Sequence, residues 1–193
     1  MRMRFLILNS GCFLFCMAFA LCQTVPKSSL SSGTLTAEQM SIYKEFFSDY
    51  SKGSKAVLNI SQTTSTFEAD EGDLGGCMKT FTKSNSRAAT VHSFAEGAFA
   101  DERVRLVDPK THTISDPGEA IARGQSVDDA VEAGFARGLL TLSEIVFDGS
   151  HTHAAFNYSF HCGRLCGHGA TVVFQLRGGK WRRSKAYCGS WIN

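Results

Sequence analysis

From Leu139 to the end of the chain apolar and polar residues alternate, and this alternation constrains the fold more than any other feature of the sequence. A period of two is typical of a β-strand that buries one of its faces. The alternating runs cover residues 139–147, 152–162, 166–177 and 180–192. They are separated by Asp148-Gly149, by Gly163-Arg164-Leu165 and by Gly178-Gly179. The pattern predicts a β-meander of about four sequential antiparallel strands.

Helical signals come before this region. Thr36 and Gln39 form a capping-box pattern, and apolar residues then recur at helical spacing, which predicts an amphipathic helix over residues 37–51. Asp116-Pro117 and Ser126 are two further helix starts, and Val127, Ala130, Val131 and Phe135 recur along the second of these helices. Short strands are expected at 56–60, 63–67 and 101–108. This order predicts an α+β fold, with amphipathic helices packed on an antiparallel β-meander of about four C-terminal strands.

Residues 1–20 have the pattern of a secretory signal peptide. Arg2 and Arg4 precede an apolar run, and Ala18-Phe19-Ala20 matches a signal-peptidase site. A membrane anchor is the alternative, but the run is shorter than the roughly 20 apolar residues of a spanning helix. Lipidation of Cys22 is a second alternative, which the bulky Leu21 before it disfavours. We therefore expect a signal peptide at 1–20, a flexible arm at 21–35 and one domain at 36–193, with no transmembrane segment in the mature chain.

Charge argues against a nucleic-acid partner. The chain has 20 Lys and Arg against 18 Asp and Glu, a net charge of +2. Two of the basic residues, Arg2 and Arg4, lie in the signal segment, which has no acidic residue, so the mature chain is neutral. Lys180, Arg182, Arg183 and Lys185 form a basic cluster, but a neutral chain is not expected to have the basic surface that binding to phosphates requires.

Five cysteines follow the signal segment: Cys22, Cys77, Cys162, Cys166 and Cys188. A three-residue turn at 163–165 would place Cys162 opposite Cys166 on one face of the hairpin. A disulfide between them is expected in an exported chain, with another pairing or a metal site as alternatives. The candidates for disulfides are therefore Cys162, Cys166, Cys77 and Cys188, and Cys22 is the odd thiol.

A bridge from Cys77 to Cys188 would be the main covalent brace, because it closes a far longer loop than Cys162–Cys166. A two-residue turn at Gly178-Gly179 puts Cys188 on the outer face of the sheet, so residues 68–86 would have to cross that face. The same register places Trp181, Tyr187 and Trp191 on the core face together with Arg183 and Lys185, unless a bulge re-aims them.

The second half of the chain resembles an uncharacterised family of exported bacterial proteins. The resemblance rests on the strand 138–148, on the hairpin Cys162-Gly163-Arg164-Leu165-Cys166-Gly167 and on the closing Trp191-Ile192-Asn193. The family ends in Ser where this chain has Asn193. The resemblance implies the same strands and export, and it implies no activity.

Two classes of function follow from these patterns. The first is a non-catalytic binding or interaction module of the cell envelope, secreted or periplasmic, without a cofactor. It would bind a protein or a small apolar ligand in a pocket lined by Tyr158, His168, Trp181 and Trp191.

The alternative is a thiol- or metal-dependent enzyme that uses the Cys/His hairpin at 161–168. Adjacent residues of a strand point to opposite faces, so His161 and Cys162 cannot form a catalytic pair locally. A metal site could also draw on His151 and His153, which otherwise form a polar turn and strand start. We expect the binding module, with no catalytic residue and no metal ligand assigned.

Overall fold

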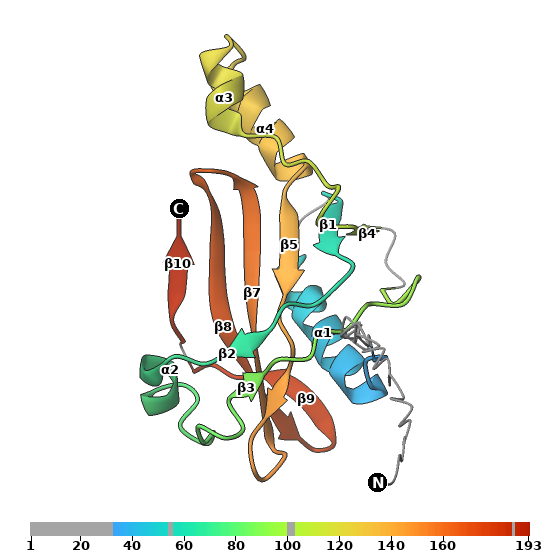
Figure 1. The fold of residues 1–193 in the computed structure, drawn as a ribbon, viewed down its shortest axis with the longest axis vertical. Helices are drawn as coiled ribbons and strands as arrows, with labels where there is room; N and C mark the ends of the chain where they lie inside the picture. The colour runs from blue at the N-terminus through green and yellow to red at the C-terminus, as the bar shows by residue number, and fades with distance from the viewer. Residues whose placement is uncertain (1–32, 54–55, 100–102, 187) are drawn as a thin grey trace, which may run out of the picture.

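The computed structural model describes residues 33–53, 56–99, 103–186 and 188–193. The expected signal peptide at 1–20, Cys22, most of the arm at 21–35 and Tyr187 lie outside these residues. The fold is mostly β, with a large mixed sheet that curls into a half-barrel (Figure 1).

The eight-stranded sheet has the order β10-β8-β7-β5-β1-β4, with β6 paired to β7 and β9 paired to β8. The strands are β1 (Leu58–Ser61), β4 (Val104–Val107), β5 (Leu139–Leu142), β6 (Val146–Phe147), β7 (His153–Gly163), β8 (Cys166–Arg177), β9 (Lys180–Arg183) and β10 (Ser190–Ile192). β1 is parallel to both β4 and β5, and the other pairs are antiparallel. A separate two-stranded ribbon consists of β2 (Phe67–Glu68) and β3 (Arg87–Ala88).

The expected fold class is therefore wrong: the sheet is a mixed one and not an antiparallel meander of four strands with helices on it. β1 and β4 extend it beyond β5 by parallel pairing, which joins segments far apart in the sequence. A strand of four residues carries too little pattern to indicate its partner. The run expected at 180–192 is also two strands, because β9 and β10 pair with different parts of β8.

The helices are α1 (Ala37–Tyr50), α2 (Glu71–Gly75), α3 (Pro117–Ala122) and α4 (Val127–Ala136). α1 begins as expected, because the Thr36 hydroxyl accepts from the Gln39 amide at 3.1 Å and the Gln39 side chain accepts from the Thr36 amide at 2.9 Å. α3 and α4 begin at the expected caps, Asp116 and Ser126. They project from one end of the sheet and do not cover its face (Figure 1).

Both faces of the sheet carry a hydrophobic cluster. On the first, the core face, Tyr43 and Phe46 of α1 pack edge-on against Phe156 of β7, and all three are fully buried. On the second, the outer face, Met78 and other residues of the segment after β2 pack with Ala155, Val173 and Cys188. Residues 68–86 thus cross the outer face, as the Cys77–Cys188 bridge requires.

The part of the chain that the structure describes has two disulfides, so the expected disulfide bracing is confirmed. Cys77–Cys188 joins Cα atoms 5.3 Å apart across 111 residues of sequence. Cys162–Cys166 joins Cα atoms 5.0 Å apart at the tip of the β7–β8 hairpin. The turn between β7 and β8 is shorter than expected, because Gly163 pairs with Cys166 and a bulge lies between His161 and Gly163.

Candidate functional site

A polar groove of about 480 Å³ lies on the outer face of the sheet. We call it the outer-face groove. It is lined by Ser65, Asp70, Asp73, Thr141, Asn157, Tyr158, Ser159, Ala170, Thr171, Gly189, Ser190 and Trp191. Its volume falls within the range of about 300–1,000 Å³ typical of small-molecule sites.

The floor of the groove comes from three adjacent strands. Thr141 of β5 lies opposite Ser159 of β7, and Asn157 of β7 lies opposite Thr171 of β8. Because side chains alternate between faces, these four side chains share the outer face. The alternation that places Phe156 in the core therefore also produces a continuous polar floor.

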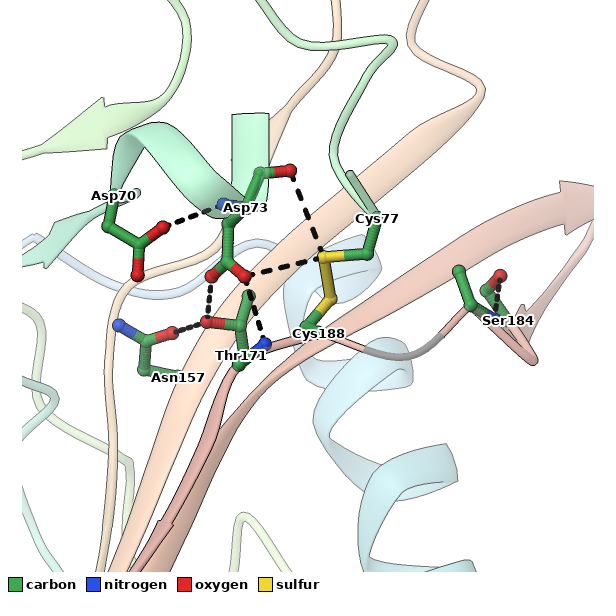
Figure 2. Close-up of a disulfide and its surroundings, with 9 residues drawn as sticks. Asp70, Asp73, Cys77, Asn157, Thr171, Ser184 and Cys188 are labelled. Atoms are coloured by element: carbon green, nitrogen blue, oxygen red, sulfur yellow. Dashed lines mark hydrogen bonds between the residues drawn. A yellow bond between two sulfur atoms is a disulfide. The ribbon is translucent and has the colours of Figure 1, made fainter. Parts of the chain in front are cut away.

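Asp70 and Asp73, at the start of α2, line one end of the groove, and the longer disulfide lies next to Asp73 (Figure 2). Asp70 caps α2, and its carboxylate accepts from the Asp73 amide at 2.6 Å. The buried Asp73 carboxylate accepts from the Thr171 hydroxyl at 2.6 Å and from the Gly189 amide at 3.0 Å. Since Gly189 follows Cys188, the disulfide and Asp73 hold the same piece of chain against β8.

The Thr171 hydroxyl lies beside two acceptor oxygens but has only one proton to donate. Its hydroxyl oxygen lies 2.6 Å from Asp73 Oδ2 and 2.7 Å from Asn157 Oδ1, and a hydroxyl can donate only one proton. The charged Asp73 is the stronger acceptor and receives it. The Asn157 amide then either donates to Thr171 with its nitrogen or keeps its oxygen there without a proton. In both orientations Asn157 retains hydrogen-bonding capacity for a ligand.

Trp191 borders the groove at β10, on the outer face. This differs from the register expected for it, which put Trp191 on the core face. Seven residue steps from Arg183 to Ser190 oppose four steps from Phe174 to Ala170, so three extra residues separate β9 from β10. An odd number of extra residues moves Trp191 to the other face.

The Trp191 indole lies flat against β8. A Cβ added to Gly169 would lie 2.5 Å from the indole nitrogen, and Gly167 also lies under the ring. The His161 ring is 5.2 Å from the indole, and 37% of Trp191 is exposed. The strand covers one side of the ring, so the exposed part is available to a ligand.

The residues expected to line one pocket lie in three places. Trp191 and part of Tyr158 border the outer-face groove, but the Tyr158 ring packs with Phe46 and His168 on the core face. Trp181 packs against Phe147 near the start of α1, where its indole nitrogen donates to Glu38 at 3.1 Å. The structure therefore brings Tyr158 and His168 together and leaves Trp181 apart.

His168 is held by Tyr50, whose hydroxyl lies 3.1 Å from Nε2. Burial lowers the pKa of His168, and the neighbouring His161 lowers it further. Burial and the neighbouring Tyr158 raise the pKa of Tyr50. Both groups are neutral near pH 7, which suits a structural hydrogen bond.

The Cys/His hairpin offers no thiolate in this structure, because Cys162 and Cys166 form a disulfide. His161 lies on the opposite face, against Trp191. The two other histidines considered for a metal site lie far from the hairpin tip. His153 begins β7, about 30 Å from Cys162 along the strand. Its ring pairs with Asp148 at 3.0 Å, and His151 pairs with Glu38 at 2.9 Å.

One further group of possible metal ligands lies beside the groove. The Asp73 carboxylate is close to the sulfur atoms of Cys77 and Cys188. These sulfurs form a disulfide, and a disulfide lacks the thiolate that a metal binds. The carboxylate also accepts two hydrogen bonds already, so this cluster stabilises the chain and offers no metal site.

A buried carboxylate that the sequence patterns did not single out lies outside the groove. Glu144 is 2% exposed, and its carboxylate accepts from the His92 amide and from the Thr64 hydroxyl. The His92 Nδ1 atom lies 2.9 Å from Glu144 without hydrogen-bond alignment. Burial and the charge of Glu144 raise the pKa of Tyr43. The only signal for this network was an acidic residue inside an apolar run.

No helix within the described residues is long and apolar enough to cross a membrane. Comparison of the chain with protein-family models, with curated proteins and with solved structures finds no match. The function is therefore argued from the groove itself.

Proposed function

We propose that the protein is an exported binding module of the bacterial cell envelope, which holds a hydroxyl-rich ligand of the saccharide class in the outer-face groove. The observation that carries this proposal is the combination of a polar floor with an exposed indole at its border. A sugar ring has hydroxyl groups around its rim and C–H groups on its faces. The floor residues would bind the hydroxyls, and the Trp191 ring would contact a C–H face.

Export is supported by two features. Residues 1–20 have the signal-peptide pattern, and two disulfides are typical of proteins in oxidising compartments. Within the described residues, the space between α1 and β7 is filled by side chains such as Tyr43, Phe46 and Phe156. A pocket of about 360 Å³ lies farther along α1, beside Leu58 and Val104, but it has no polar floor like that of the outer-face groove.

Binding of defined sugars tests the proposal. Triacetylchitotriose, maltotriose and mannotriose are titrated into the oxidised protein by isothermal calorimetry. We expect at least one of them to bind, and we expect Trp191→Ala and Thr171→Val each to weaken it at least about tenfold. Thr111→Val is the matched control, because Thr111 lies in an exposed turn at Asp108. The proposal fails if none of the three sugars binds, or if binding is the same in both groove variants.

Export is tested separately by sequencing the N-terminus of the protein recovered from a bacterial periplasm. We expect the mature chain to begin at Leu21. A chain that keeps residues 1–20 and stays in the cytosol would contradict export without bearing on the sugar site.

A further inference from the structure

Helix α4 exposes its large apolar side chains and buries its small residues. Val127 is 59% exposed, Val131 37% and Phe135 51%. These residues are spaced four apart, so they form one stripe along the helix. The buried residues of α4 are Ala130 and Gly134. The expectation that the apolar residues of this helix pack together on the sheet is therefore corrected.

The reason is the close contact between α4 and α3. A Cβ added to Gly134 would lie 2.6 Å from Pro117 Cγ and 3.2 Å from the Cys162 carbonyl oxygen. Only a residue without a side chain permits this approach, so α4 turns its small face toward α3 and the hairpin tip. The stripe of Val127, Val131 and Phe135 is left facing outward, although Phe135 also stacks on Phe160.

We propose that this stripe pairs with the same stripe of a second copy of the chain, with the two α4 helices antiparallel. Val131 is the midpoint of the stripe, so a two-fold axis there places Val127 against the partner's Phe135 at both ends. The large Phe135 ring of each copy thus packs against the smaller Val127 side chain of the other copy.

Charge at the helix ends favours the antiparallel arrangement. The first turn of α4 carries Asp128 and Asp129, whereas Arg137 caps its other end. Antiparallel pairing places each acidic first turn beside the end of the partner helix that carries Arg137, and it opposes the two helix dipoles. A parallel pair would bring the two acidic first turns together. Glu132 is next to the axis, so its two copies lie on the same flank and repel one another.

A membrane surface fits the apolar stripe of α4 less well than a second copy of the chain does. α3, α4 and their caps carry five acidic residues against two basic ones: Asp116, Glu119, Asp128, Asp129 and Glu132 against Arg123 and Arg137. Anionic lipids would repel this excess of acidic groups. Helix α4 has ten residues, too few to bury the roughly 800 Å² per partner of a standard interface. The dimer is therefore weak and depends on concentration.

Sedimentation of the oxidised chain over a range of concentrations tests the interface. We expect a monomer–dimer equilibrium that Val131→Asp abolishes. Val57→Asp serves as the matched control, because Val57 is 41% exposed and lies elsewhere. Arg137→Glu should weaken the dimer up to about tenfold, since the change acts at both ends, and Glu132→Gln should strengthen it.

Two outcomes would overturn the proposal. One is a dimer that Val131→Asp leaves intact. The other is a chain that stays monomeric at every concentration. If that monomer sediments with vesicles of anionic phospholipid, the stripe faces a membrane instead of a second copy.

Cross-linking tests the two-fold axis itself. In a Cys22→Ser background, Val131→Cys should give a covalent dimer on mild oxidation, because the two copies of residue 131 face each other. Val127→Cys should not, since its two copies lie about 12 Å apart along the helix axis, too far for a disulfide. Efficient cross-linking through residue 127 but not through residue 131 would contradict the antiparallel arrangement.

Discussion

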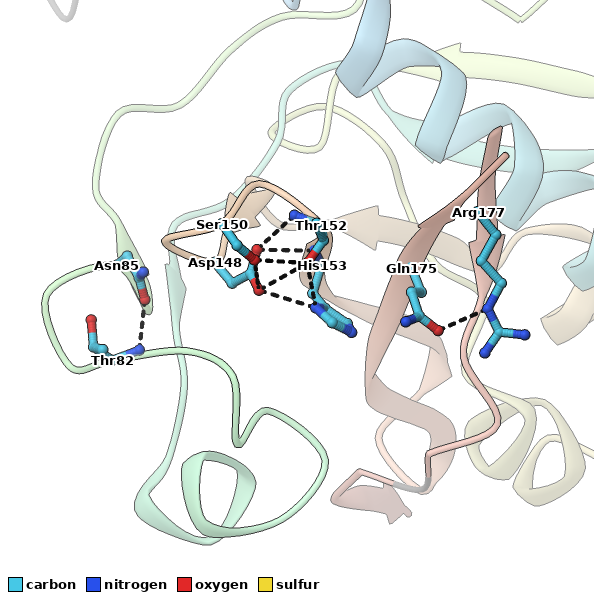
Figure 3. Close-up of polar contacts among 8 residues, drawn as sticks. All are labelled: Thr82, Asn85, Asp148, Ser150, Thr152, His153, Gln175 and Arg177. Carbon is cyan, nitrogen blue, oxygen red and sulfur yellow. Dashed lines mark hydrogen bonds and ion pairs between the residues drawn. The ribbon is translucent and has the colours of Figure 1, made fainter. Parts of the chain in front are cut away.

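At the scale of single residues, the carboxylate of Asp148 holds one turn of the chain together. It follows β6, and its carboxylate accepts from the amides of Thr152 and His153 at 2.8 and 3.0 Å (Figure 3). The Ser150 hydroxyl and the His153 ring also bond to it. Burial alone raises the pKa of Asp148, but these hydrogen bonds outweigh burial and lower the pKa from 3.8 to about 2.

We predict that Asp148→Asn destabilises the protein by about 1–3 kcal/mol at pH 7, because an amide nitrogen would replace one of the accepting oxygens. A carboxyl group whose pKa is lowered by folding stabilises above its ordinary pKa, and this contribution is lost as the pH falls through about 2. The difference in free energy of unfolding between the wild-type protein and Asp148→Asn should therefore become smaller as the pH falls below about 4. Urea unfolding at neutral pH and again near the lowered pKa measures it, with Ser150→Ala as the milder comparison.

At the scale of elements, the Asn59 side chain connects the end of α4 to the sheet by hydrogen bonds. Asn59 of β1 is 4% exposed, and its amide nitrogen donates to the carbonyl oxygens of Ala136 and Gly138, both at 3.0 Å. The carbonyls at the end of a helix lack partners within the helix. Asn59 supplies the missing donors, and so it fixes where α4 ends and β5 begins.

We predict that Asn59→Asp costs about 3 kcal/mol or more, because a carboxylate would face two carbonyl oxygens without a donor. The effect is measured by thermal or denaturant unfolding. Asn85→Asp is the matched control: Asn85 uses its side-chain oxygen to accept from the Thr82 amide, and Asp keeps that oxygen. Equal losses in the two variants would show that the donors of Asn59 are not what holds α4.

At the scale of the whole molecule, the two disulfides differ in what they constrain. Cys77–Cys188 joins residues 111 positions apart and attaches the outer-face segment to the end of the sheet. Cys162–Cys166 closes a loop within one hairpin that β7 and β8 already hold. The longer bridge also positions Gly189 next to Asp73, and hence one end of the outer-face groove.

We predict that replacing Cys77 and Cys188 by Ser lowers the free energy of unfolding by about 5 kcal/mol, against about 2 kcal/mol for the Cys162 and Cys166 pair. The larger value follows from the longer closed loop. Paired unfolding curves of the two double variants measure the difference. Sugar binding should weaken only in the Cys77 and Cys188 variant, and an equal loss in both would contradict the assigned role of the longer bridge.

The sequence alone determined the features that depend on neighbouring residues. The cap of α1, the starts of α3 and α4, and the two faces of β7 and β8 follow from capping residues and from periods that the chain itself repeats. These patterns were readable because each is carried by residues that are neighbours in the sequence. The floor of the groove is implicit in them, since the polar positions of β7 and β8 are known once their core positions are.

Only the tertiary structure decided the features that depend on distant partners. Parallel pairing of β1 with β4 and β5 joins separate parts of the chain. The three extra residues between β9 and β10 move Trp191 to the outer face, and the close contact at Gly134 turns the apolar stripe of α4 outward. Each of these features depends on how two elements pack against each other. Tertiary packing, and not local propensity, supplies the free energy that stabilises these arrangements.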